Sequence, residues 1–145
     1  MKKGNGHTLP EVTLADVYVT MDSYKVLYDL LNERTKEQSI SHKRTPTMQE
    51  HIAFVRTIPY AAWYLIVAAG QPRPVGAIYL TRQREIGIFI FKAHHGNGYA
   101  AAALEQLRAL FPGPMLANIN PHNEPSLAFF RKHGGHEIQR TFELP

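Results

Sequence analysis

The sequence predicts an α/β (α+β) protein with a single sheet of mixed strand direction. The chain has 145 residues, of which 44% are hydrophobic and 19% are charged. That length and composition are typical of one globular domain, here residues 1–145. Strand and helix patterns follow in the order strand, two helices, three strands, helix, strand, helix, strand. The three consecutive strands favour antiparallel pairing, and the strand–helix–strand units after them favour crossover connections.

The chain begins with a strand and a helix. Residues Glu11–Thr20 are rich in β-branched side chains, which favours a strand. Asp22 and Ser23 are candidate N-caps for the helix that follows. Helical spacing gives this helix one apolar face, formed by Val26, Leu27, Leu30 and Leu31.

A second helix has a clear start and stop. Thr47 and Glu50 are three residues apart, which is the spacing of a capping box. Pro59 ends the helix because proline cannot continue the helical hydrogen-bond ladder. Its expected apolar side consists of Ile52, Phe54 and Val55.

Three strands occupy the middle of the chain. Residues Ala61–Ala69 form a continuous apolar run, and Val75–Arg82 would pair with it as a hairpin across the turn at 70–74. Residues Glu85–Phe91 predict the next strand. Gly87 lies inside it, and a glycine there indicates a bulge or a close approach of other atoms to the backbone.

In the last part of the chain, the sequence pattern predicts a helix over Tyr99–Leu110 and a short strand over Met115–Asn120. It then predicts a second helix, which Gly134 and Gly135 end. Residues 136–144 predict a final strand. Two partners for that strand are open: the preceding strand of the same chain, which we favour, or a second copy of the chain.

A glycine pair marks the junction before the helix at Tyr99. Gly96 and Gly98 flank Asn97, and residues 100–103 are all alanine. Such a junction offers unpaired backbone N–H groups at the positive end of a helix dipole, which suits a phosphate. The pair alone also fits a plain turn. It is neither a dinucleotide-binding fingerprint nor a P-loop, because the third glycine and the Gly-Lys-Ser/Thr sequence are absent.

Two motifs give the chain a family resemblance. Residues 95–100 read His-Gly-Asn-Gly-Tyr-Ala, close to a Gln/Arg-x-x-Gly-x-Gly/Ala motif, and a second signature consists of Asn123, Ser126, Phe130 and Gly134. Together with the element order, they resemble the GNAT superfamily of acetyl-CoA-dependent N-acetyltransferases along nearly the whole chain. The resemblance implies a mostly antiparallel sheet flanked by about four helices, with the fourth and fifth strands splayed apart.

The resemblance also implies a cofactor site for acetyl-CoA. The backbone of Ile88 and Ile90 would pair with the pantetheine amides, as an added strand would. The N–H groups of residues 96–100, from Gly96, Asn97 and Gly98 to Tyr99 and Ala100, would hold the pyrophosphate. Asn123 would contact the pantetheine arm, and the signature positions Ser126 and Phe130 would lie beside the cofactor.

Two positions depart from the family pattern. His95 replaces the usual Gln or Arg, and its imidazole either donates to a phosphate or is a solvated loop side chain. Phe130 stands where many members have a tyrosine that protonates the leaving thiolate. Because a thiol has a pKa near 8.5, solvent or another donor could replace that tyrosine. A CoA-binding module without turnover is the alternative that these departures leave open.

The acceptor amine needs a base, and the candidates are Glu85 and His122. Glu85 opens the fourth predicted strand and is otherwise a solvated strand-end charge, whereas His122 follows the fifth strand. His42, His51 and His94 are weaker candidates. By resemblance, the acceptor is an amino group of a nucleotide-linked sugar, a protein N-terminus, or a polyamine or antibiotic amine.

Composition and residue spacing also bear on nucleic-acid binding, metal binding and location. The net charge is +4 without a run of five or more like charges, which does not favour nucleic-acid binding. The chain has no cysteine, and no histidine pair is spaced with a carboxylate as in a metal site, so we expect no metal. Neither a secretory signal nor a membrane span is expected. The expected protein is a cytoplasmic monomer or homodimer.

Overall fold

A computed structural model of the chain describes residues 8–34 and 44–145. Those residues form a five-stranded sheet in the order β1-β2-β3-β4-β5. The first four strands pair antiparallel, and β4 and β5 pair parallel. The strands are β1 (Val12–Asp16), β2 (Ala62–Ala68), β3 (Gly76–Leu80), β4 (Glu85–Ile90) and β5 (Leu116–Ala117). The helices are α1 (Ser23–Glu33), α2 (Met48–Arg56), α3 (Tyr99–Leu110), α4 (Glu124–Lys132) and the short 3-10 helix η2 (Lys92–His94).

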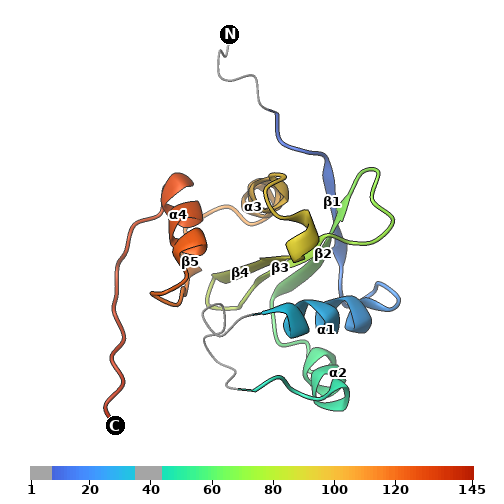
Figure 1. Ribbon diagram of the computed structural model, residues 1–145, viewed down its shortest axis with the longest axis horizontal. Helices are drawn as coiled ribbons and strands as arrows, with labels where there is room; N and C mark the ends of the chain where they lie inside the picture. Colours follow the sequence, from blue (N-terminus) through green and yellow to red (C-terminus); the bar gives the residue numbers. More distant parts are fainter. Residues whose placement is uncertain (1–7, 35–43) are drawn as a thin grey trace.

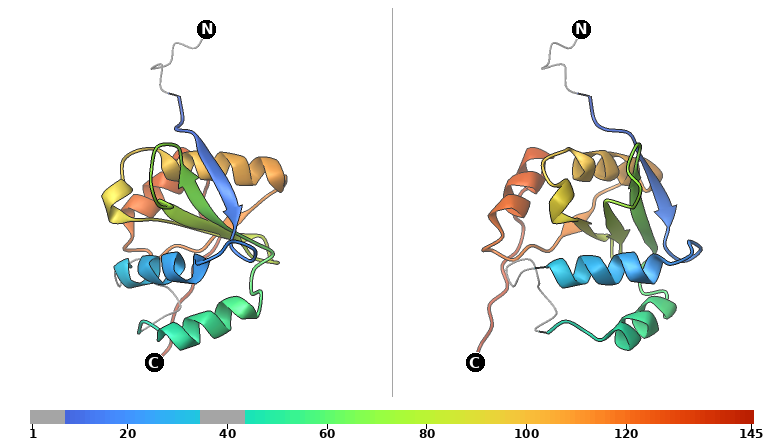
Figure 2. Two further views of the ribbon diagram at one scale, coloured as in Figure 1. Left: turned by 90° about the vertical axis from the view of Figure 1, so that its right-hand side faces the viewer. Right: turned by 45° about the vertical axis from the view of Figure 1, so that its right-hand side comes forward.

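The sheet separates two apolar layers. Helix α3 covers one face, while α1 and α2 cover the other (Figures 1 and 2). The α3 layer is the larger, and its buried members include Ile66, Ile78, Ala103 and Leu107. The layer under α1 and α2 contains Leu27, Leu30, Val55, Trp63 and Leu65. Alternating side chains along β2 and β3 supply both layers, as expected for a sheet covered on both faces.

The predicted N-cap is present in α2 but not in α1. Thr47 and Glu50 form the expected capping box, with Glu50 N–H donating to Thr47 Oγ1 at 3.1 Å and Thr47 N–H donating to Glu50 Oε1 at 2.8 Å. The Asp22 side chain does not cap α1, because Asp22 has a left-handed backbone with φ of 62° and makes no cap hydrogen bond. Ser23 does not cap it either, since its hydroxyl donates to Val17 C=O at 2.9 Å.

Strands β4 and β5 separate after two residue pairs. Glu85 is opposite Leu116 and Ile86 is opposite Ala117, where the pairing ends, although β4 continues to Ile90. The predicted splay is therefore present, and β5 is much shorter than the predicted Met115–Asn120. The open part of the β4 edge is the feature on which the site is built.

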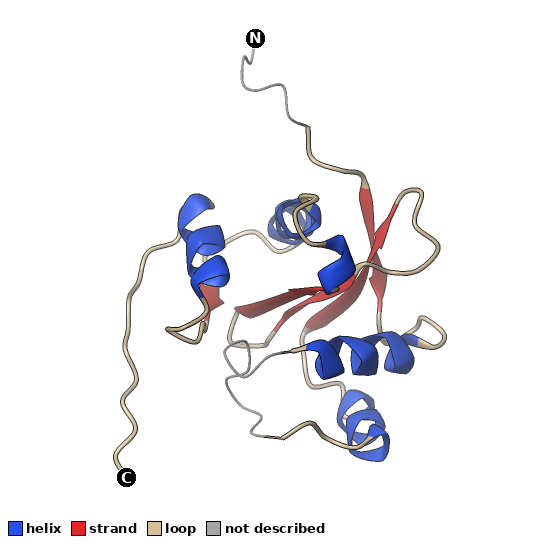
Figure 3. Cartoon of the chain, in the orientation of Figure 1, coloured by secondary structure: helices blue, strands red, loops and turns tan. Residues whose placement is uncertain are grey.

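The prediction of a final strand is wrong. Residues 135–145 form no secondary structure and extend away from the sheet beyond α4 (Figure 3). Their large apolar side chains are exposed: Ile138 by 66%, Phe142 by 82% and Leu144 by 88%. A strand is stable only with a hydrogen-bonded partner and a face to bury. The described residues pair this segment with neither, so β5 lacks the neighbour that we expected within the chain.

Candidate active site

The open edge of β4 presents backbone groups toward the gap beside β5. Thr81 N–H donates to Glu85 C=O at 2.8 Å, and Phe91 N–H donates to Val75 C=O at 2.9 Å. Bonded and non-bonded pairs alternate in an antiparallel ladder. The odd-numbered residues of β4 therefore bond to β3, while the even-numbered Ile88 and Ile90 direct their N–H and C=O groups to the open side. This is the orientation that pairing with an extended amide-containing ligand requires.

The N-terminus of α3 lies at the far end of this edge. Gly96 and Gly98 have φ values of 80° and 82°. No side chain caps α3, and a hydrogen bond from Ala102 N–H to Gly98 C=O at 3.0 Å closes its first turn. Among the described residues, no acceptor bonds the N–H groups of Tyr99 and Ala100. A Cβ atom at Gly96 would meet nothing within 4 Å, whereas one at Gly98 would lie 3.1 Å from Pro10 Cδ, so the loop is open at Gly96. The junction thus has the form of an anion site.

The loop is held together by its own side chains. Asn97 donates through Nδ2 to the carbonyls of His94 and His95, at 3.1 Å and 3.4 Å. The His95 ring bonds through Nε2 to Ile90 C=O at 2.8 Å. A carbonyl only accepts, so Nε2 is the protonated ring nitrogen. His95 therefore closes the loop onto the end of β4 and occupies one of the carbonyls that we assigned to the pantetheine.

The second signature runs along α4, from its N-cap Asn123 to Gly134 just beyond its C-cap. Asn123 is the N-cap, and its Oδ1 accepts from Ser126 N–H at 3.3 Å. The Phe130 ring packs against the apolar cluster on the α3 face of the sheet, as do Tyr99, Ile88 and Ile90. The structure therefore brings together three predicted parts of the cofactor site: the β4 edge, the start of α3 and α4.

The two candidate bases lie at the start of β4 and in the loop before α4. Glu85 is half-buried at the start of β4, where β4 and β5 converge, and its N–H donates to Thr81 Oγ1 at 3.0 Å. His122 is exposed in the loop before α4, where its N–H donates to Asn120 Oδ1 at 2.8 Å. Neither side chain has a hydrogen-bond partner among the described residues. Of the weaker candidates, His94 lies in η2, and His42 lies outside the described residues.

Sequence reasoning missed Arg84, which fixes β5 against β4. Its Nε donates to Pro114 C=O at 2.7 Å, and its Nη2 donates to Phe111 C=O at 2.8 Å. The same Nη2 also bonds the carbonyls of Pro112 and Gly113, at 3.1 Å and 3.2 Å. The Arg84 carbonyl accepts from Leu116 N–H at 2.8 Å. One arginine thus holds the segment that leads into β5. A left-handed residue with φ of 66° in a turn is visible only in the structure.

A pocket of about 470 Å³ lies on the other side of the sheet, under α1 and α2. Its aromatic lining consists of Phe54, Tyr60, Trp63, Tyr79 and Phe89. The rings of Tyr60 and Tyr79 stack at 4.0 Å with 6° between their planes. Burial raises the pKa of both tyrosines, so both hydroxyls are neutral at pH 7.

Gly87 explains how this pocket approaches β4. It is opposite Tyr79 in the β3–β4 register, and a Cβ atom at Gly87 would lie 2.3 Å from Tyr79 Cζ. The tyrosine side chain therefore lies directly across the β4 backbone, which confirms the predicted close approach. Phe89, two residues further on, lines the same pocket. The pocket and the open edge are thus on adjacent surfaces of one strand.

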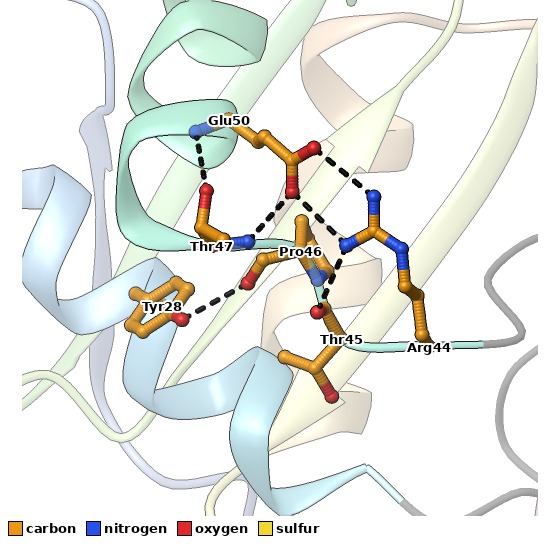
Figure 4. A network of polar contacts seen from close by, with 6 residues as sticks. All are labelled: Tyr28, Arg44, Thr45, Pro46, Thr47 and Glu50. Carbon is orange, nitrogen blue, oxygen red and sulfur yellow. Dashed lines mark hydrogen bonds and ion pairs between the residues drawn. The ribbon is translucent and has the colours of Figure 1, made fainter.

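The rim of the pocket is an ion-paired network (Figure 4). Arg44 donates to both carboxylate oxygens of Glu50, at 3.1 Å and 3.0 Å, and Tyr28 OH donates to Pro46 C=O at 2.9 Å. The hydrogen bonds from Arg44, together with those from Thr47, lower the pKa of Glu50 to about 2. Glu50 is therefore ionised and engaged across the ordinary pH range.

His51, one of the weaker candidates for the base, also lines this pocket. It is 3% exposed, and His51 and Val55, four residues apart, are the buried residues of α2. By contrast, Phe54, which we placed on the apolar side, is 44% exposed. Burial lowers the pKa of His51, while a hydrogen bond to the Tyr24 backbone opposes that effect. The spacing of His51 from Val55 was the signal in the sequence.

Two classes of site are absent from the described part of the chain. No three His, Asp or Glu side chains there are grouped so that they could hold a metal ion. None of the helices formed by residues 8–34 and 44–145 is long and apolar enough to cross a membrane.

Comparisons with known proteins agree with this geometry. No curated protein matches the chain by sequence. An acetyltransferase from Thermus thermophilus aligns over 92% of this chain and 92% of its own, with a TM-score of 0.69 and 21% identity. A domain from Methanocaldococcus jannaschii aligns over 92% of this chain and 94% of its own, with a TM-score of 0.72 and 18% identity. A putative acetyltransferase, yncA of Salmonella typhimurium, solved with acetyl-CoA, covers 88% of the chain (0.61, 17%, 79% of its own chain). The family model for the acetyltransferase (GNAT) domain matches residues 18–136. The chain therefore belongs to the GNAT acetyltransferase family, whose members use acetyl-CoA as the acetyl donor.

Proposed function

We propose that the protein is an N-acetyltransferase that moves the acetyl group of acetyl-CoA to a primary amine. The observation that carries this proposal is the open edge of β4 leading to the uncapped start of α3. The edge offers the N–H and C=O of Ile88 to pantetheine amides, and the backbone from Gly96 to Ala100 offers donors to the pyrophosphate. The residues present fit acetyl-CoA, which supplies an activated thioester.

The chemistry requires one bond exchange and two proton movements. The amine nitrogen bonds to the thioester carbonyl carbon as the carbon–sulfur bond breaks. The amine loses one proton, and the departing sulfur gains one. Because a thiolate is a good leaving group with a thiol pKa near 8.5, Phe130 is compatible with turnover and solvent can donate the second proton.

We assign the first proton to Glu85 in preference to His122. Glu85 lies at the convergence of β4 and β5, where the gap that would hold the thioester begins. His122 lies in an exposed loop before α4. A base contributes on the order of 10²-fold to such a step. The proposed acceptors are an amino group of a nucleotide-linked sugar or a protein N-terminus, and the protein acts in the cytoplasm as a monomer or homodimer without nucleic acid or membrane.

An impaired CoA-binding module is the second candidate, because the partly buried Phe130 ring has no proton to donate to the leaving thiolate. Thiol release from acetyl-CoA with a panel of primary amines separates the two. We expect amine-dependent release, lowered about 10²-fold in Glu85→Gln and much less in His122→Gln. CoA binding without any amine-dependent release would establish the module instead.

A further inference from the structure

The pocket under α1 and α2 adjoins the proposed thioester position through β4. Tyr79 lies across Gly87, and Gly87 immediately precedes Ile88, whose backbone faces the open edge. An amine seated in the pocket would therefore approach the gap between β4 and β5 from the face opposite α3. The chemistry of the pocket lining should then select the acceptor.

The lining is suited to a flat apolar group. Trp63 meets Tyr60 edge-to-face with ring centroids 4.7 Å apart, and Tyr79 lies 6.3 Å from Phe89. Tyr60 and Tyr79 stack on each other, so both rings are fixed parts of the wall. Rigid aromatic walls bind an aromatic ring by offset stacking and edge contacts at little entropic cost. A volume of about 470 Å³ accommodates a ring and a short spacer.

The lining is poorly suited to a polycation. Among the described residues that line the pocket, Glu50 is the one acidic side chain, and Arg44 engages both of its carboxylate oxygens. The guanidinium carbon of Arg34, a cationic group, lies 4.3 Å from the centre of the Phe89 ring. A second ammonium group on the acceptor would meet the guanidinium groups of Arg34 and Arg44, while the Glu50 carboxylate is already engaged by Arg44. The pocket therefore disfavours polyamines and aminoglycoside-type amines.

One polar atom in the pocket wall lacks a partner. His51 Nε2 is buried and makes no hydrogen bond with the described residues. We assign the ring proton to Nδ1, because the Tyr24 backbone stabilises the protonated ring and raises the pKa of His51 against the effect of burial. Nε2 therefore carries a lone pair. A buried acceptor without a donor is unfavourable, and a ligand O–H or N–H group would satisfy it.

We infer that the acceptor is an aromatic monoamine: an amino group joined by a short aliphatic spacer to a ring that bears one hydrogen-bond donor. The ring stacks within the aromatic lining, its donor bonds His51 Nε2, and its amine points past Tyr79 to the β4–β5 gap. This inference rests on the proposed acetyl transfer, and it favours an aromatic amine over the nucleotide-linked sugar named above. An N-terminal tyrosine of a peptide satisfies the same description.

The test compares four amines with the full chain: tyramine, phenethylamine, spermidine and kanamycin. We expect kcat/KM for tyramine to exceed that for either polycation at least about tenfold, because the polycations bring unpaired charge into the pocket. The value of kcat/KM for tyramine should exceed that for phenethylamine roughly three- to tenfold, because only tyramine has a hydroxyl that can donate to His51. Equal or better turnover of spermidine or kanamycin would overturn the inference.

Variants of His51 test the hydrogen bond itself. In His51→Ala, the ratio of kcat/KM for tyramine to that for phenethylamine should fall to about one. His51→Gln, which keeps a carbonyl acceptor, should retain part of the preference. A ratio within one variant does not depend on how much of the sample is folded. An unchanged ratio in His51→Ala would refute the role of His51.

Equilibrium binding separates this inference from the proposed reaction. Calorimetric titration of the CoA-bound protein with tyramine and with spermidine requires no turnover. Tighter binding of tyramine without acetylation of any amine would leave the pocket assignment standing and refute the proposed function. Acetylation with tighter binding of spermidine would refute the pocket assignment alone.

Discussion

The two sides of β4 are built in different ways. Toward β5, the site consists of backbone groups on one strand edge and at one helix start. Toward α1 and α2, it consists of side chains from two helices, three strands and the segments between them. The first kind of site is encoded by a short stretch of sequence, because glycines and a helix start suffice. The second requires the folded chain, because its members are up to 62 residues apart, from Leu27 to Phe89.

The largest expected effect concerns Arg84, which fixes the point where the two sides meet. Arg84→Ala removes hydrogen bonds to four carbonyls, and we expect the free energy of unfolding to fall by about 2 kcal/mol. The affinity of the Arg84→Ala variant for CoA should also fall, because β5 would no longer be held beside β4. Arg82→Ala is the matched control, since Arg82 also donates to backbone carbonyls, those of Ile58 and Pro59, away from β5. Equal CoA affinity in both variants would show that Arg84 does not position the gap.

A smaller effect concerns pH and the pocket side. Burial holds the pKa of His51 below its ordinary value of 6.5, so the unfolded state binds more protons than the folded state below that pH. The contribution of neutral His51 to stability is therefore complete above pH 6.5 and is lost as the pH falls toward the folded-state pKa. Thermal unfolding between pH 5 and 8 should show less acid destabilisation in His51→Gln. His133, whose pKa is also lowered by burial, should leave a residual slope, and parallel profiles would contradict this assignment.

The smallest effect concerns the C-terminal segment, which belongs to neither side. Deleting residues 137–145 should change the free energy of unfolding by less than about 0.5 kcal/mol, as for surface changes away from packed groups. Differential scanning calorimetry and sedimentation test this directly. A large loss of stability, or a change from dimer to monomer, would indicate that the segment pairs with β5 of a second chain.

The difference between features made by neighbouring residues and features made by distant segments explains what the sequence could predict. The Thr47–Glu50 cap, the hairpin of β2 and β3, and the loop at Gly96 and Gly98 depend on neighbouring residues, and all three are present. The final strand also had a local apolar pattern, but a strand needs a partner that local sequence does not supply. The spacing of His51 from Val55 indicated that His51 is buried. The contacts of His51 and Arg84 are with distant segments, however, and nothing near either residue in the sequence identified them.

The most direct test of the backbone-built cofactor site is CoA affinity at Ala100, in the first turn of α3. Ala100→Glu places a carboxylate at a helix N-terminus, which favours the helix but repels a phosphate. Ala100→Gln has the same shape without the charge. We predict by calorimetry that Ala100→Glu binds CoA on the order of 10- to 100-fold more weakly than Ala100→Gln, at unchanged or higher thermal stability, while Phe54→Ala in the pocket binds CoA normally. Equal CoA affinities in Ala100→Glu and Ala100→Gln would contradict a pyrophosphate site at the start of α3.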